Sequence, residues 1–294
     1  MSDTPNNRIA ALPCWQSEVT IEPLSGGMTN LNFKVSDASG DYVVRLGEDD
    51  PVHLISRSNE IASCEAAFAV GVSPQLLYHE PGILVVSFVE GRVLGESDVR
   101  QDSNLRRIVE LLLRFHQQIP LHFNQVPVMF WVFQVLRHYT NLLKQGNSAH
   151  ASRLANLSAI ARKLETAVGP VEIVFGHNDL LAANFIDDGD KIWLIDFDYA
   201  GFNSPLFDLS NLASNNELSE AQEGNMLEQY YPGAVDEARL SSYHAMKCAS
   251  LLRETMWSMV SETYSRLDMD FAGYTQKNLA RFESIYAEFE KNFI

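Results

Sequence analysis

The chain has 294 residues, 46% of them hydrophobic and 20% charged, so it is long enough to bury a large core in one domain or in two smaller lobes. Its formal net charge of −16 argues against binding to nucleic acid or to anionic membranes, because such binding usually takes a basic face. The same charge would suit a cationic substrate, although an acidic surface also serves solubility on its own.

The first 90 residues alternate between strand-like segments and tight turns. Strands are expected at residues 19–24, 31–35 and 42–46, and two more at 75–79 and 83–89. Residues 58–70 predict a helix, with Ser58 as its N-cap and Gly71 as its end. Glu90 and Gly91 then mark a hinge. These features predict a small N-terminal lobe with an antiparallel sheet over residues 1–90.

From residue 100 onward the sequence becomes mostly helical. Residues 105–118 place Ile108, Leu111, Leu112 and Phe115 at helical spacing, and further helices are expected at 133–145, 152–168 and 240–267. An interruption at 171–202 contains two short apolar strands around the turn at 187–190. We therefore expect an α+β protein with two lobes, in which the second lobe, residues 91–294, is larger and mostly helical.

Nothing in the sequence indicates a membrane segment or a disulfide-linked secreted protein. No apolar run approaches the ~18 residues of a membrane-spanning helix, and the polar residues 1–8 lack the apolar core of a signal peptide. Cys14, Cys64 and Cys248 are widely separated and lack the spacing of metal ligands. We therefore expect a cytoplasmic protein that does not insert into membranes and whose cysteines are reduced thiols.

The strongest chemical signal lies at residues 175–198. Asp179 and Asn184 have the spacing of the kinase loop H-x-D-x-x-x-x-N, and Asp196 follows a short apolar strand. In phosphoryl transfer one carboxylate orients the attacking hydroxyl and accepts its proton, while an amide oxygen and a second carboxylate hold Mg²⁺ between the phosphates of ATP. Each residue alone is more often a turn or cap residue, but the ordered set is much less expected by chance. His177 is expected to hold the loop by hydrogen bonds.

The N-terminal lobe offers candidate ATP-binding residues. Gly26 and Gly27 lie in a loop between two strands, where glycine lets the backbone approach phosphates closely, although a hairpin turn also uses glycine. Arg45 on the third strand and Glu60 on the helix occupy the positions of the phosphate-binding lysine and its glutamate partner in kinases, with a surface ion pair as the alternative. By analogy, adenine is expected at the backbone of Phe88 and Val89.

Several segments together resemble the choline/ethanolamine kinase family, which belongs with the aminoglycoside phosphotransferases in the protein-kinase-like fold. These segments are Gly26-Gly-Met-Thr-Asn30, Arg45, His177-Asn-Asp179 with Asn184, and Ile195-Asp-Phe-Asp-Tyr-Ala-Gly201. The resemblance extends from Leu24 to Tyr286 and implies that Asp179 is the base and that Asp208 anchors the catalytic loop. It implies Asn184 and Asp196 as Mg²⁺ ligands. The implied ATP-binding residues are Gly26, Gly27, Thr29, Asn30, Arg45 and Glu60.

The resemblance also implies an acceptor site made of an acidic residue after the metal aspartate and of aromatic residues from C-terminal helices. Asp198 and Tyr199 match the first part, and Trp257 and Tyr274 match the second. Eukaryotic choline kinases usually carry Glu at the position of Asp198 and a second Trp near Val260. This chain differs at both positions, which affects the prediction of choline as the acceptor more than the prediction of kinase activity. Packing in a helical core is the alternative for Trp257 and Tyr274.

The predicted function is ATP- and Mg²⁺-dependent phosphorylation of the hydroxyl of a small cationic alcohol, with choline ranked first and ethanolamine second. Other acceptors in the same superfamily are thiamine, an aminoglycoside or a sugar. Alternatives of another class are an acidic helical interaction protein and a non-catalytic nucleotide-binding pseudokinase, which the presence of Asp179, Asn184 and Asp196 disfavours. The expected partners are ATP and the amino alcohol, without nucleic acid, and a homodimer is left open.

Overall fold

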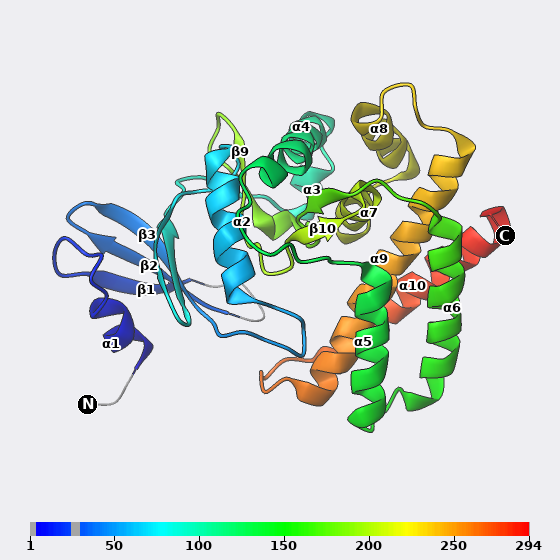
Figure 1. Cartoon of the computed structure of the whole chain (residues 1–294), viewed down its shortest axis with the longest axis horizontal. Coiled ribbons are helices and arrows are strands. Elements are labelled where there is room, and N and C mark those ends of the chain that lie inside the picture. The colour runs from blue at the N-terminus through cyan, green and yellow to red at the C-terminus, as the bar shows by residue number, and fades with distance from the viewer. Residues whose placement is uncertain (1–3, 25–29, 294) are drawn as a thin grey trace. The chain divides into compact units, whose positions relative to one another are not determined.

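The computed structural model describes residues 4–24 and 30–293 (Figure 1). The predicted loop residues Gly26, Gly27 and Thr29 therefore lie outside the described residues. Two compact units make up the chain: the first is Met1–Leu94, Gln118–Val126 and Ala183–Asp198, and the second is Gly95–Gln117, Pro127–Ala182 and Tyr199–Ile294. The boundary expected at residue 90 stays a prediction. The segment Ala183–Asp198, which contains the predicted metal ligands, clusters with the N-terminal residues.

A five-stranded antiparallel sheet forms most of the first unit. In spatial order its strands are β1 (Thr20–Leu24), β2 (Leu31–Asp37), β3 (Gly40–Leu46), β5 (Ile83–Ser87) and β4 (Leu76–Glu80). Successive side chains of a strand point to opposite faces, so Phe33 and Val35 share one face of β2, and Val44 and Leu46 share one face of β3. These residues pack in one core with Ile9 of α1 (Pro5–Ala10), a helix that the sequence did not indicate.

The helix α2 (Arg57–Ala69) begins slightly earlier than predicted, because Ser56 and not Ser58 is the N-cap. It ends as predicted before Gly71, whose φ of +74° lies in the left-handed region that favours glycine. A second sheet in this unit has the order β6-β8-β9 and includes the hairpin predicted around residues 187–190. Its strands are β6 (Arg92–Val93), β8 (Phe185–Asp187) and β9 (Ile192–Leu194). The short helix η1 (Ile119–Leu121) belongs to the same unit.

The second unit is mostly helical, and α9 (Glu237–Tyr264) is its central helix. This 28-residue helix contacts α5, α6, α7 and α10, and Figure 1 shows these helices gathered around it. Most of its residues from Tyr243 to Ser261 are buried, as expected for a helix with neighbours on several sides. The helices are α3 (Glu96–Val99), α4 (Asp102–Gln118), α5 (Val132–Gln145), η2 (Ala151–Arg153), α6 (Leu154–Val168), α7 (Pro205–Asn215), α8 (Glu220–Tyr230), α9 and α10 (Phe271–Phe293).

The helices α4, α5, α6 and α9 were predicted with bounds within a few residues, whereas α7, α8 and α10 were not. Cys64 and Cys248 are buried, Cys14 is partly buried, and all three are free thiols, as expected. Burial raises the pKa of Cys248 to about 12, so this thiol is protonated at neutral pH. Among the described helices, none is both long and apolar enough to cross a bilayer.

Candidate active site

The predicted catalytic loop starts from a short two-stranded ribbon in the second unit. β7 (Val174–Gly176) pairs antiparallel with β10 (Gly201–Asn203). Just after β7, Asn178 adopts a φ of +67°, and its side-chain amide donates to the carbonyl oxygens of Tyr199 at 2.9 Å and Gly201 at 3.2 Å. A left-handed residue other than glycine costs about 1–3 kcal/mol, and these hydrogen bonds offset that cost. The turn thereby fixes the backbone next to Asp179.

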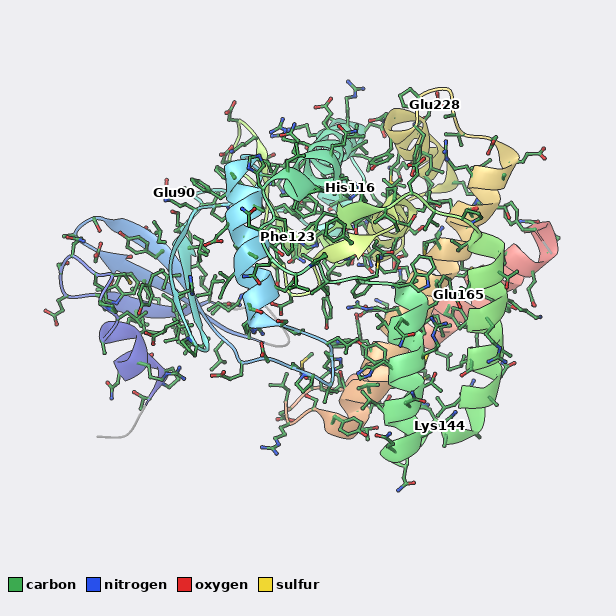
Figure 2. The ribbon with its side chains drawn as sticks, in the orientation of Figure 1. Glu90, His116, Phe123, Lys144, Glu165 and Glu228 are labelled. Atoms are coloured by element: carbon green, nitrogen blue, oxygen red, sulfur yellow. The ribbon has the colours of Figure 1, made fainter. Side chains whose placement is uncertain are left out.

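Asp208 of α7 anchors the same loop. Its carboxylate is fully buried and accepts hydrogen bonds from the backbone amides of His177 and Asn178, each at 2.7 Å. It also lies 2.8 Å from Nε2 of His116, which is labelled on α4 in Figure 2. The other ring nitrogen of His116 lies 2.7 Å from the hydroxyl of Tyr230. Burial alone would raise the pKa of Asp208, but His116 and His177 hold that pKa below its ordinary value, so the anchor is a carboxylate.

The three aromatic residues predicted for the acceptor site contact one another in the second unit. Nε1 of Trp257 donates to the hydroxyl of Tyr199 at 3.0 Å, and the rings of Trp257 and Tyr274 meet edge to face with centroids 6.4 Å apart. The Tyr274 hydroxyl donates to Oε1 of Glu254 at 2.7 Å. Trp257 is only 5% exposed and also packs against Phe271, so it has the core contacts that the alternative expected.

Arg253 lies among these aromatic side chains. Its guanidinium carbon is 4.3 Å from the centroid of the Tyr199 ring, and its Nη1 lies 3.0 Å from Oε2 of Glu254 and 3.6 Å from Oδ1 of Asp179. Burial alone would lower the pKa of Arg253, but the surrounding phenolic and carboxyl oxygens raise it, so the side chain stays charged. We call this group the aromatic cluster; its members are Asp179, Tyr199, Arg253, Glu254, Trp257 and Tyr274.

In the first unit, Arg45 and Glu60 form the ion pair that the sequence predicted. Nη1 of Arg45 lies 2.6 Å from Oε1 of Glu60, 2.8 Å from Oδ1 of Asp196 and 3.1 Å from Oδ1 of Asp198. Glu60 is 1% exposed, so the pair is not the surface ion pair of the alternative interpretation. Burial alone would lower the pKa of Arg45, but Asp196, Glu60 and Asp198 raise it well above its ordinary value.

A second guanidinium, that of Arg57, joins the same group. Its Nη1 lies 2.6 Å from both Oε2 of Glu60 and Oδ1 of Asp198, and its Nη2 donates to Oδ1 of Asn30 at 2.6 Å. A side chain at Gly47 would place its Cβ 2.9 Å from Nη2 of Arg57, so glycine at position 47 leaves room for this contact. We call this group the arginine cluster; its members are Asn30, Arg45, Arg57, Glu60, Asp196 and Asp198.

Asp198, which was expected at the acceptor site, belongs to the arginine cluster, and its role toward the acceptor stays a prediction. The sequence predicted an acidic group that would meet a cationic acceptor. Oδ1 of Asp198 instead contacts both arginines, and Oδ2 accepts from Nδ2 of Asn30 at 3.0 Å. Its carboxylate therefore pairs with the guanidinium groups of Arg45 and Arg57 within the first unit.

The two predicted metal ligands, Asn184 and Asp196, also lie in the first unit. The carbonyl oxygen of Asn184, in η3 (Ala182–Asn184), accepts from the amide of Ile195 at 3.0 Å. Asp196 has a φ of +68°, and its side chain is 25% exposed. Within residues 4–24 and 30–293, no group of three or more His, Cys, Asp or Glu could hold a metal ion. A two-oxygen protein site fits Mg²⁺, which usually completes its shell with water and substrate phosphate.

The charge of the arginine cluster also fits a bound cation. Two guanidinium groups face three carboxylates, so one negative charge is left over. That net negative charge would attract a divalent cation beside Asp196. A cluster with equal numbers of positive and negative charges would attract it less.

A hydrogen bond next to the sheet reduces the number of backbone groups that could make the expected contact with adenine. The backbone amide of Phe88 donates to the carbonyl of Asp41 at 3.0 Å, so this N–H is committed to the protein. Nζ of Lys34 lies 4.4 Å from the centroid of the Phe88 ring. An adenine contact from this segment would therefore use the carbonyl of Phe88 or the backbone of Val89.

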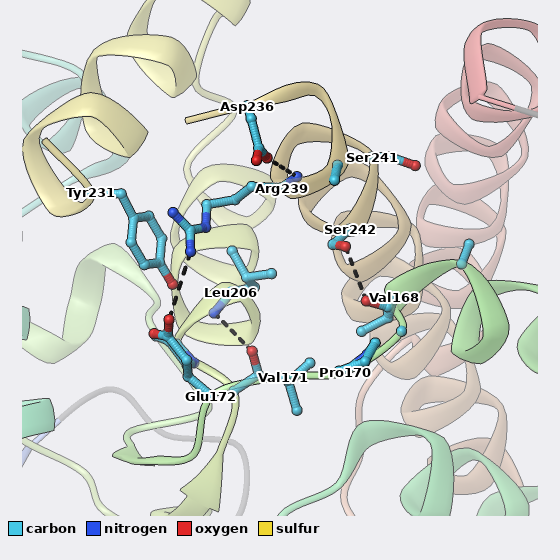
Figure 3. Close-up of a pocket in the computed structure, with 15 residues that line it drawn as sticks. Val168, Pro170, Val171, Glu172, Leu206, Tyr231, Asp236, Arg239, Ser241 and Ser242 are labelled. Atoms are coloured by element: carbon cyan, nitrogen blue, oxygen red, sulfur yellow. Dashed lines mark hydrogen bonds and ion pairs between the residues drawn. The ribbon is translucent and has the colours of Figure 1, made fainter. Parts of the chain in front are cut away.

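A cavity of about 600 Å³ lies elsewhere in the second unit (Figure 3). The guanidinium of Arg239 covers the Tyr231 ring at 4.2 Å from its centroid and lies 3.6 Å from Glu172, and all three residues line the cavity. None of the described residues predicted for the active site lines it, so the cavity is not connected to the predicted chemistry.

Arg57, Arg253 and Glu254 are the residues of the two clusters that the sequence prediction missed. A helical signal existed for each of them. Arg57 stands three residues before Glu60, and Arg253 and Glu254 stand four and three residues before Trp257. Side chains three and four residues apart are neighbours on a helix, so the choice of Glu60 and Trp257 could have led to all three.

Three comparisons with known proteins identify the family of this chain and its fold. Residues 21–224 match the family model of choline/ethanolamine kinase. A protein of Arabidopsis thaliana named probable ethanolamine kinase is 26% identical over 290 residues, which cover 87% of this chain and 76% of that protein. A solved structure of a choline/ethanolamine kinase family protein from Mesorhizobium loti is 25% identical, with a TM-score of 0.78, and covers 95% of this chain and 92% of that one.

The structure of LicA in complex with AMP is similar in fold, with a TM-score of 0.73 at 21% identity over 95% of this chain and 96% of that one. The expected α+β, two-lobed, protein-kinase-like fold is thereby confirmed. Membership of a kinase family also implies ATP as the phosphate donor. Because the family model matches more than half of the sequence, the chain belongs to the choline/ethanolamine kinase family.

Proposed function

We propose that this kinase transfers the γ-phosphoryl group of ATP, with Mg²⁺, to the hydroxyl of a small cationic amino alcohol, either ethanolamine or choline. The observation that carries the proposal is the charge of the aromatic cluster. The carboxylates of Asp179 and Glu254 flank the guanidinium of Arg253 beside buried Trp257 and partly buried Tyr199 and Tyr274, so these three charged side chains together carry one net negative charge. A singly charged ammonium would neutralise it at a place where water screens charge poorly.

Each predicted residue then has a role. Asp179 orients the acceptor hydroxyl and accepts its proton as the new P–O bond forms, with Asp208 holding the loop. Arg45, held by Glu60, contacts the phosphates of ATP together with the loop that ends at Asn30. Asn184 and Asp196 would hold Mg²⁺, which when bound neutralises the charge of the phosphates. The AMP bound to LicA supports a nucleotide site in this fold.

A coupled assay of ADP release tests the proposal. Purified protein is supplied with ATP and, in turn, ethanolamine, choline, thiamine, an aminoglycoside and a sugar, each with and without Mg²⁺. We expect release that needs both Mg²⁺ and an amino alcohol. Asp179→Asn should lower kcat by about 10²–10⁴-fold while its melting temperature stays near that of the wild type.

A matched control for this substitution is Asp190→Asn, because Asp190 is an exposed turn residue between β8 and β9. It should leave kcat unchanged. Preference for thiamine, an aminoglycoside or a sugar would replace the proposed acceptor. ATP binding without ADP release would instead indicate the pseudokinase. The cytoplasmic location stays a prediction of the sequence.

A further inference from the structure

Arg253 occupies a position that a substrate cation would be expected to use. A positive charge over the face of an aromatic ring is attracted by the ring's electrons, and aromatic cages bind quaternary ammonium groups in this way. The guanidinium of Arg253 already lies over Tyr199, at 4.3 Å from the ring centroid, and Phe130 lies 5.8 Å away. With Arg253 2% exposed, this contact is internal to the protein and not a surface contact.

Two nitrogens of Arg253 are buried in a way that argues against a role in binding a carboxylate of the substrate. The guanidinium is instead a permanent positive charge of the protein. Its Nε and Nη2 are inaccessible to solvent and have no hydrogen-bond partner among the described residues. A ligand carboxylate would need to reach this edge to form two parallel hydrogen bonds with it. Because no solvent reaches these nitrogens, only Nη1, with its contacts to Glu254 and Asp179, faces polar groups.

The carboxylate of Glu254 beside Arg253 remains able to accept further hydrogen bonds. Oε2 of Glu254 contacts Arg253 and Oε1 accepts from Tyr274, but each carboxylate oxygen has two lone pairs. A primary ammonium can donate to such oxygens at short range. A quaternary ammonium has no N–H and depends on charge and aromatic faces, one of which Arg253 covers here.

We propose that Arg253 is a specificity-determining residue of this kinase. It covers the Tyr199 face and leaves carboxylate oxygens to hold the acceptor nitrogen, so the enzyme prefers a primary ammonium alcohol over its quaternary counterpart. This inference rests on the proposed function and names ethanolamine over choline within it. The sequence ranked choline first on the aromatic residues alone, without Arg253.

A series of acceptors tests the inference on the wild-type protein. The kcat/KM is measured for ethanolamine, its N-methyl and N,N-dimethyl derivatives, choline and homoserine. We expect kcat/KM to fall by about 10- to 100-fold from ethanolamine to choline, the value of one charge-assisted hydrogen bond. The largest single step should come with the third methyl group, which removes the last N–H donor.

Two variants test the role of the residue itself. Arg253→Met removes the charge from the Tyr199 face and should shift the ratio of kcat/KM toward choline by about tenfold or more. The matched control is Arg239→Met, since Arg239 lies on the same helix and covers Tyr231 at 4.2 Å from the ring centroid. This control should leave the ratio unchanged.

The outcomes separate the inference from the proposed function. If choline is used as well as ethanolamine, or if folded Arg253→Met keeps the wild-type ratio, the inference is overturned while the proposed function stands. If homoserine is preferred, a carboxylate does reach Arg253 and the inference is overturned. If no amino alcohol is phosphorylated, the proposed function fails and the inference fails with it. If Arg253→Met does not fold, the wild-type series still decides.

Discussion

Replacement of Arg57 by alanine tests whether the arginine cluster holds the first unit together. Arg57 links three chain segments: α2 through Glu60, the segment after β9 through Asp198, and the segment before β2 through Asn30. Its side chain is 14% exposed and that of Glu60 is 2% exposed. The cluster already has three carboxylates and two guanidinium groups, so the variant would leave three carboxylates facing Arg45 alone.

The magnitude follows from the burial of the carboxylates that lose their partner. Removing one partner of a buried ion pair costs about 3–5 kcal/mol, because the remaining charge stays buried without compensation. We therefore expect Arg57→Ala to lower the free energy of unfolding by about 3 kcal/mol or more. Arg57→Lys should recover only part of the loss, since an ammonium cannot present two nitrogens in the fixed plane that reaches Glu60, Asp198 and Asn30 together.

The assay combines denaturant unfolding with steady-state kinetics. Because Asn30 is one of the predicted ATP-binding residues and Asp198 contacts another, Arg45, the KM for ATP should rise in Arg57→Ala while the KM for the amino alcohol changes little. The matched control is Arg137→Ala, which breaks an exposed pair with Glu165 at 2.8 Å and should cost less than about 1 kcal/mol. Equal stability losses in the two variants, or a wild-type KM for ATP in Arg57→Ala, would refute the reasoning.

Three further predictions concern neighbouring residues. Arg45→Ala should raise the KM for ATP and leave that of the acceptor nearly alone; the reverse pattern would place Arg45 elsewhere. Asn184→Ala and Asp196→Ala should each raise the Mg²⁺ concentration at half-maximal rate, and unchanged midpoints in both would remove the metal assignment. Asp208→Asn should lower stability at pH 7 by about 2–4 kcal/mol, since a buried carboxylate that accepts several hydrogen bonds is lost. Its pKa in the folded protein is held below the ordinary value of an aspartate, so this contribution should be present above that ordinary value and be lost as the pH falls through the folded pKa, where wild type and variant should converge.

Much of the fold could be predicted because local patterns agree with the final structure. In the strands at residues 31–35 and 42–46, buried side chains alternate with partly buried ones from Phe33 and Val44 onward, and the turn between the strands fixes their register. The helix α10 was missed although it is 23 residues long. Its buried positions recur every three or four residues, as on one face of a helix, but Thr275 and Asn278 among them are polar. The apolar pattern that sequence reasoning relies on is therefore interrupted in the first half of this helix.

The catalytic loop could be predicted for a different reason. Asp179, Asn184 and Asp196 lie within 18 residues of one another, so their spacing alone carries the signal. The two arginines could not be placed in the same way. The sequence distance from Arg57 to Asp198 is 141 residues, and a contact over that distance depends on the tertiary fold. Arg253 is likewise 74 residues from Asp179 by their numbers.

The neighbours Asp198 and Tyr199 show that residues adjacent in sequence can contact different groups. Both were assigned to the acceptor because they follow the metal aspartate together. Asp198 instead contacts Arg45 and Arg57, whereas the hydroxyl of Tyr199 accepts from Trp257. Sequence adjacency fixes the distance between two backbones, but burial and charge decide which partner each side chain meets.

The two clusters also show how a strongly acidic chain can position cations selectively. In each cluster the carboxylates outnumber the guanidinium groups by one; Arg253 is buried, whereas Arg45 and Arg57 are partly buried. The excess charge beside Asp196 suits a metal that also meets phosphate oxygens, whereas the excess beside Asp179 and Glu254 suits an organic ammonium. The net charge of −16 is consistent with both but specifies neither, since charges at the solvent-exposed surface are screened. Under the proposed function, selectivity would come from the arginines, because each one determines how much negative charge its carboxylates leave for a ligand.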